Sequence, residues 1–151
     1  MVGQRLSLRA RALSFLARRE HSRAELVRKL QSHTEDPDEL KRLLDDFEQR
    51  GWLSDKRFVE QTVSRLAAKY GVRRIVHTLR DKGVSEAAIA TALTEVKSNE
   101  IAAARSVLRR KFSMPPATKE ERARQSRFLQ GRGFGYDVIR RALRDTGDES
   151  E

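Results

Sequence analysis

Clusters of adjacent basic residues recur along this chain of 151 residues. Three of them stand out: Arg18-Arg19, Arg73-Arg74 and Arg109-Arg110-Lys111. A guanidinium group keeps its charge at any physiological pH, and its planar donors can hold a phosphate or a carboxylate through two parallel hydrogen bonds. Any single arginine is better interpreted as part of a solvated helix face. The three clusters together predict a binding surface for an anionic partner.

Further basic residues extend this candidate surface on both sides of the clusters. The formal net charge of the chain is +10, which favours an anionic partner such as nucleic acid or a nucleoprotein assembly. The complete set of candidate partner-binding residues is Arg18, Arg19, Arg28, Lys29, Arg65, Lys69, Arg73, Arg74, Arg80, Lys82, Arg105, Arg109, Arg110, Lys111, Arg124, Arg127 and Arg132.

Residues for catalysis or metal binding are not evident. The chain contains no cysteine, which excludes a disulfide framework, a thiolate metal site and a cysteine nucleophile. The three histidines show no metal-ligand spacing, and Asp45-Asp46 fits the solvated face of an acidic helix. We find no nucleophile paired with a base. The sequence therefore predicts a binding protein that is not an enzyme and that needs neither a metal nor another cofactor.

The glycine-rich segment from Gly131 to Gly135 superficially resembles a phosphate-binding loop. Such loops follow a strand and open a helix, whereas these glycines follow a predicted helix, so we interpret them as a helix stop and the next helix cap. The longest apolar runs have about four residues, far below the ~20 that span a bilayer. No signal peptide is evident either. We expect a cytoplasmic monomer without a membrane partner.

An internal repeat positions the basic clusters. Four apolar positions recur after 49 residues, where Leu26, Leu30, Leu40 and Leu44 align with Ile75, Leu79, Ile89 and Leu93. A further shift of 50 aligns Leu79, Gly83, Ile89 and Leu93 with Leu129, Gly133, Ile139 and Leu143. Each copy has the apolar spacing of three helices. The sequence predicts an all-α protein of three tandem three-helix units, in an elongated, curved array of right or left hand.

The predicted units cover residues 6–53, 54–97 and 98–144, each with three separate helices. A loop insertion is expected near 113–120, where Pro115-Pro116 stands, and residues 145–151 are expected to form an acidic disordered tail. In the third unit, Gln125 and Ser126 take the places of two apolar residues of the second unit. We expect the second helix of that unit to be loosely packed.

Capping residues support the predicted helix starts. Ser22 to Glu25 and Thr118 to Glu121 have the spacing of a capping box. Asp36, followed by Pro37, and Ser85 are predicted to cap the third helices of the first and second units. Because different residues supply caps at aligned places, chance similarity between the units is a poor explanation.

A helix-turn-helix transcriptional regulator is the alternative interpretation. Its recognition helix would present base-reading residues near its start, but Ser85-Glu86-Ala87-Ala88 and Asp36-Pro37-Asp38-Glu39 are small or acidic. A stacking platform for single strands would place aromatic residues among the basic clusters. Here Phe58, Tyr70, Phe112 and Phe134 fit core positions better. The predicted surface therefore recognises charge and shape, without reading bases.

Over nearly its whole length, the chain resembles the RecX family, regulatory partners of the RecA recombinase. The resemblance rests on Gly51-Trp52-Leu53-Ser54-Asp55-Lys56-Arg57-Phe58-Val59, on Lys82-Gly83-Val84-Ser85 before Ile89, and on Arg132-Gly133-Phe134 before Ile139. It implies a protein of DNA recombination, DNA repair and the SOS response. Such a protein would bind in the groove of the RecA filament on single-stranded DNA. It would suppress ATP hydrolysis, strand exchange and filament extension.

Overall fold

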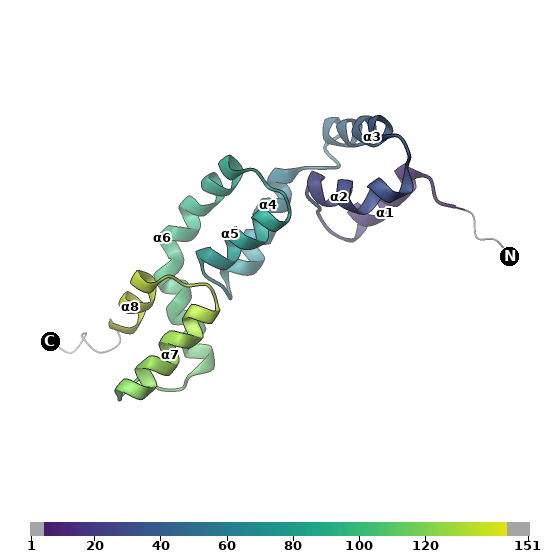
Figure 1. The fold of residues 1–151 in the computed structure, drawn as a ribbon. Coiled ribbons are helices and arrows are strands. Elements are labelled where there is room, and N and C mark those ends of the chain that lie inside the picture. The colour runs from purple at the N-terminus through teal and green to yellow at the C-terminus, as the bar shows by residue number, and fades with distance from the viewer. Residues whose placement is uncertain (1–4, 145–151) are drawn as a thin grey trace.

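The computed structural model describes residues 5–144 and contains eight α-helices with one short 3-10 helix in that range. Three groups of helices follow one another along an elongated molecule (Figure 1). The first group contains α1 (Leu8–Arg18), α2 (Arg23–Leu30), η1 (Gln31–His33) and α3 (Pro37–Gln49). Next come α4 (Asp55–Ala67), α5 (Val72–Asp81) and α6 (Glu86–Lys111), and then α7 (Lys119–Gly131) and α8 (Tyr136–Arg144). The predicted all-α fold of three-helix units is confirmed, and the expected tail at 145–151 lies outside the described residues.

Helix α6 differs from the sequence prediction. The third helix of the second unit and the first helix of the third unit were expected to be separate, but both belong to this one helix of 26 residues. No glycine or proline interrupts the segment, so nothing in it breaks the helix. The N-terminal half of α6 buries Ile89 and Leu93 in one core, and its C-terminal half buries Val107 and Leu108 in the next.

Each unit has its own apolar core. The repeated leucines and isoleucines are the positions that fill these cores: Leu26, Leu30, Leu40 and Leu44 in the first, Ile75, Leu79, Ile89 and Leu93 in the second, and Leu129, Ile139 and Leu143 in the third. The molecule therefore consists of three small cores in series, whose relative positions are fixed by contacts between units and, for the second and third, also by the continuous helix α6.

The helix starts follow the predicted caps. The hydroxyl of Ser22 accepts a hydrogen bond from the Glu25 backbone N–H at 3.0 Å, and the Glu25 carboxylate accepts one from the Ser22 N–H at 3.2 Å. Asp36, Ser85 and Thr118 likewise cap α3, α6 and α7 through their side chains. These bonds satisfy backbone donors that the first turn of a helix leaves without partners.

In helix α7, the polar residue Gln125 stabilises the structure. Gln125, which replaces an apolar residue of the second unit, is buried, and its amide donates to the carbonyl of Met114 at 3.2 Å. Phe128 packs edge-on against Phe112, with ring centroids 5.5 Å apart. Gln125 therefore anchors the loop that the insertion adds, and this contact offsets the apolar side chain that the repeat has lost.

The two contacts between neighbouring units are built alike. In the first, Gly83 in the turn between α5 and α6 packs directly against the methyl group of Ala24 on α2. In the second, Gly133 in the turn between α7 and α8 packs against Arg74 near the start of α5. The backbone angle φ is +75° at Gly83 and +90° at Gly133, a region that glycine adopts without steric cost. We call these contacts the first and second joint.

At both joints, an N-cap residue donates a hydrogen bond to a backbone carbonyl of the next unit. The hydroxyl of Ser22, the N-cap residue of α2, donates to the carbonyl of Lys82 at 2.6 Å. The backbone N–H of Gly71, the N-cap residue of α5, donates to the carbonyl of Arg132 at 2.9 Å. Because the donors are aligned N-cap residues and each acceptor is the residue before the joint glycine, the two joints form this contact at equivalent positions.

Candidate partner-binding surface

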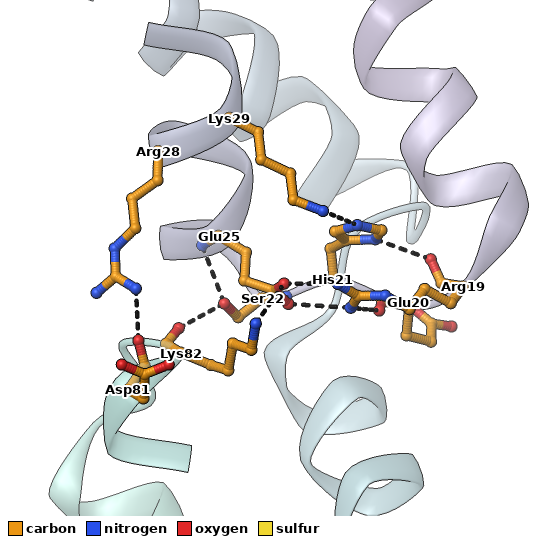
Figure 2. A network of polar contacts seen from close by, with 9 residues as sticks. All are labelled: Arg19, Glu20, His21, Ser22, Glu25, Arg28, Lys29, Asp81 and Lys82. Atoms are coloured by element: carbon orange, nitrogen blue, oxygen red, sulfur yellow. Dashed lines mark hydrogen bonds and ion pairs between the residues drawn. The ribbon is translucent and has the colours of Figure 1, made fainter. Parts of the chain in front are cut away.

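Several of the predicted binding residues hold the first joint together (Figure 2). The carboxylate of Glu25 is buried, and the Arg19 guanidinium contacts both of its oxygens, at 2.7 and 3.1 Å. Lys82 reaches the same carboxylate at 3.4 Å from the neighbouring unit. Arg28 donates to the carbonyl of Asp81 across the joint. Arg19, Arg28 and Lys82 therefore have internal partners in this protein.

The electrostatics of Glu25 follow from this geometry. Burial alone would raise the pKa of its carboxyl group, but hydrogen bonds from Arg19 and Ser22, with the charges of Arg19 and Lys82, lower that pKa to about 2. The group is thus a carboxylate throughout the physiological range. A charged group in this position is stabilised by the two units together, since Lys82 comes from the second unit.

His21 is buried beside the same carboxylate. Its Nδ1 lies 3.0 Å from the carbonyl of Arg19, and its Nε2 lies 3.1 Å from the Nζ of Lys29. Burial lowers the pKa of His21, and this favours a neutral ring that donates from Nδ1 and accepts at Nε2. Lys29 also lies over the ring of Phe15, with Nζ 4.8 Å from its centroid. The predicted binding residue Lys29 is thus in contact with two other residues of its own unit.

Aromatic rings underlie the basic residues at the second joint. The guanidinium of Arg132 lies between Tyr70 and Phe128, at 5.3 and 5.1 Å from the ring centroids. Arg74 lies 4.9 Å from the centroid of Tyr70, and Lys111 lies 5.9 Å from that of Phe128. The expected core positions of Phe58, Tyr70, Phe112 and Phe134 are confirmed, and the cations at this joint lie over rings that pack against the cores. Tyr70 follows α4 and Phe128 lies on α7, so these rings come together where the second and third units meet.

The remaining predicted residues divide into two groups. Arg80 forms a pair of hydrogen bonds with Glu86 at 2.7 and 3.0 Å, and Arg105 donates to the carbonyl of Arg141 at 3.3 Å. The others are exposed and form no ion pair within residues 5–144; we call them the exposed cations, and they are Arg18, Arg65, Lys69, Arg73, Arg109, Arg110, Arg124 and Arg127. Their role in partner binding stays a prediction.

Sequence reasoning missed one group of basic residues. A groove of about 660 Å³ lies between the start of α5 and helices α7 and α8, and Arg73 lines it together with Lys119, Arg122 and Arg140. Tyr136 stands at the same groove with 73% of its surface exposed. The positive charge of α7 and α8 was visible in the sequence. Their convergence on Arg73 depends on the second joint, which the sequence does not specify.

Two further features, a metal site and a membrane-spanning helix, were sought in the described part of the chain. Acidic, histidine and cysteine side chains do not gather there in groups of three that could hold a metal ion. Between residues 5 and 144, no helix combines the length and the apolar character that crossing a membrane requires.

Comparison with known proteins places this architecture in a family. Models of the first, second and third three-helix domains of RecX match residues 9–47, 54–93 and 98–143. The chain is 49% identical to the regulatory protein RecX of Leptothrix cholodnii over 139 residues, which cover 92% of this chain and 88% of that protein. It is 45% identical to the RecX of Ralstonia nicotianae, with 97% and 96% covered.

Solved structures agree in fold. The crystal structure of RecX from Lactobacillus salivarius superposes with a TM-score of 0.79 at 19% identity, covering 92% of this chain and 94% of that one. A second crystal structure of regulatory protein RecX gives a TM-score of 0.73 at 20% identity, with 96% and 82% covered. With family models matched along its length and close relatives of similar size, this chain belongs to the RecX family of regulatory proteins.

Proposed function

We propose that this protein regulates the RecA recombinase as a non-enzymatic inhibitor. It binds, as a monomer in the cytoplasm, in the groove of the RecA filament on single-stranded DNA, and it suppresses ATP hydrolysis, strand exchange and filament extension. Membership of the RecX family supports the regulatory role. The observation that carries the proposal of groove binding is the series of three units, joined in a fixed register, that carries exposed cations on every unit.

The joints hold the three units at a fixed spacing. A filament groove is a long, curved surface, and a ligand can contact it at several points only if its own parts are held at the right spacing. Gly83 and Gly133 let a turn of one unit pack directly against a helix of the preceding unit. At the first joint, Lys82 also forms an ion pair with the buried carboxylate of Glu25 across the units. The exposed cations of successive units are therefore presented together, at little further cost in conformational entropy.

The exposed cations suit a surface that meets phosphate groups or acidic protein side chains. Arg73 is the most informative of them, because it is exposed, lines the basic groove and lies at the second joint. Contacts of this kind position a protein on a nucleoprotein without reading bases. We therefore propose a contribution from single-stranded DNA that is electrostatic and depends weakly on sequence.

A binding measurement with assembled RecA filaments on single-stranded DNA tests the proposal. Arg73→Glu should weaken filament binding at least about tenfold, as expected when a close charge contact is reversed. Lys97→Glu is the matched control, because Lys97 is exposed on α6, lies outside the predicted set and changes the net charge equally. Equal affinities for the two variants would remove Arg73 from the interface, and no binding by the unmodified protein would overturn the proposal.

A further inference from the structure

An apolar groove lies between α4 and α6, on a part of the protein that the exposed cations do not line. Its volume is about 750 Å³, and its lining side chains come from α4, α6 and Tyr70, with none from α5. Small and apolar side chains make up most of its floor, among them Val63, Ala67, Ala88, Ala92 and Val96. Side chains of this size allow the backbone of an incoming helix to approach closely, which is how amphipathic helices dock in apolar grooves.

The charge of this groove is opposite to that of the chain as a whole. Glu60 and Glu95 are exposed at the groove, and neither carboxylate forms an ion pair within the described residues. Lys56 is the single cation among the lining residues, in a chain whose net charge is +10. Glu100 also lines the groove but accepts a hydrogen bond from the Val72 backbone N–H at 2.9 Å. Nucleic acid is a poor occupant, because its phosphates would meet glutamates.

The other two units provide an internal comparison. In the first, Arg9 on α1 bridges to Asp46 on α3 at 3.3 Å and lies 5.3 Å from the ring centroid of Phe47. In the third, Arg105 on α6 donates to the Arg141 carbonyl on α8. An arginine thus crosses from the first to the third helix in both units.

The middle unit has no such crossing residue. Before the insertion, the second and third units align at a shift of 42 residues, which matches Lys69-Tyr70 with Lys111-Phe112 and Val63 with Arg105. In the described part of the chain, no side-chain hydrogen bond or ion pair joins α4 to α6. The open, acid-rimmed groove is therefore a feature of the second unit, and it does not follow from the three-helix fold itself.

We propose that this groove binds a basic amphipathic helix of the protein partner. The apolar side of that helix would lie on the small side chains of α4 and α6, and its flanking lysines or arginines would pair with Glu60 and Glu95. The identity of the partner as RecA rests on the proposed function. The groove adds a second, protein-directed contact to the basic surface, so that binding to the filament would depend on both.

Charge reversal separates this contact from general attraction to DNA. Glu95→Lys makes the chain more positive by two charges, so a purely electrostatic attraction to filament phosphate would strengthen. A groove that pairs with a basic helix predicts the opposite, a loss of affinity for RecA filaments on single-stranded DNA of about threefold or more. Glu35→Lys is the matched control, because Glu35 is exposed, lies outside the groove and changes the charge equally. Affinities that rise equally in both variants would overturn the proposal.

Filling the groove gives a test that does not depend on charge. Ala92 lines the groove, whereas Ala90 is exposed on α6 and does not. Ala92→Trp should reduce filament binding at least about tenfold by occupying the space of the docked helix, and Ala90→Trp should leave it unchanged. Circular dichroism would show that both variants keep their helices. If folded Ala92→Trp binds as the unmodified protein does, the groove is not the docking site.

A cross-link identifies the occupant directly. The chain has no cysteine, so Thr91→Cys at the groove can carry a single benzophenone probe. We expect an adduct with RecA whose cross-linked peptide belongs to a basic amphipathic helix. An adduct with a second copy of this chain, or filament binding without any adduct, would overturn the groove proposal alone. Failure of the unlabelled protein to bind filaments would overturn the proposed function as well.

Discussion

Gly133 lies so close to Arg74 that a β-carbon at position 133 would be 2.7 Å from the β-carbon and the backbone nitrogen of Arg74. Its φ of +90° is also unfavourable for any residue with a side chain. Two separate physical requirements therefore select glycine at this joint. At the first joint, Gly83 lies similarly close to Ala24. Thr34, which aligns with Gly83 in the first unit, has a φ of −145°, so the left-handed conformation is found at the two joint glycines and not at this aligned position.

Replacing a joint glycine should destabilise the array more than its backbone conformation alone explains. Gly51→Ala is the matched reference, because Gly51 has a φ of +75° and nothing within 4 Å of its added β-carbon. We expect Gly51→Ala to lower the free energy of unfolding by about 1 kcal/mol. Gly133→Ala should cost a further ~1–3 kcal/mol, because its methyl group overlaps packed backbone. Urea denaturation followed by circular dichroism measures both, and equal losses would contradict the joint.

The carboxylate of Glu25 should make the stability of the protein depend on pH in the acid range. Its pKa is about 2 in the folded protein against an ordinary value of 4.5, so the unfolded chain takes up the proton first as the pH falls. The stabilisation is therefore complete above pH 4.5 and is lost as the pH falls toward 2. Denaturation midpoints measured across this range should decline on acidification.

Glu25→Gln isolates the charge, because glutamine can still complete the capping box with Ser22. We expect this variant to lower the free energy of unfolding at pH 7 by about 1–3 kcal/mol and to flatten the decline below pH 4.5. Glu35→Gln is the control, since Glu35 is exposed and lies outside the network. An unchanged pH profile in Glu25→Gln would show that other carboxyl groups produce the acid sensitivity.

Binding to free single-stranded DNA should depend steeply on salt and weakly on sequence. Each phosphate contact releases bound counterions, so the logarithm of the binding constant should fall linearly with the logarithm of the salt concentration. Fluorescence anisotropy with several unrelated oligonucleotides would measure both properties. Arg73→Glu should make the slope shallower by about one contact. A preference of ~4 kcal/mol or more for one duplex sequence would instead support a helix-turn-helix regulator.

Local features of this fold were predictable from the sequence. The caps at Ser22 and Ser85 and the buried positions of Leu79 and Leu129 depend on neighbouring residues and on helical spacing, which the sequence records directly. The continuity of α6 was missed because the repeat suggests a boundary at residue 97. The absence of glycine and proline there was the available signal.

The candidate site was only partly predictable, because it depends on how the units meet. Arg19 and Arg73 each belong to a pair of adjacent arginines, yet Arg19 pairs with buried Glu25, whereas Arg73 forms no ion pair within residues 5–144. The groove between α4 and α6 could not be foreseen either. It depends on Val63 standing where the third unit has Arg105. The sequence does not show that Arg105 bridges the first and third helices of its unit, so the effect of this difference is visible only in the structure.

The ATPase activity of RecA on single-stranded DNA, measured while this protein is titrated in, tests the central claim most directly. We predict that hydrolysis falls progressively as the unmodified protein is added, and that Arg73→Glu requires a markedly higher concentration for the same inhibition. Lys97→Glu should inhibit as the unmodified protein does. Hydrolysis that stays constant while the protein is bound to the filaments would contradict the account.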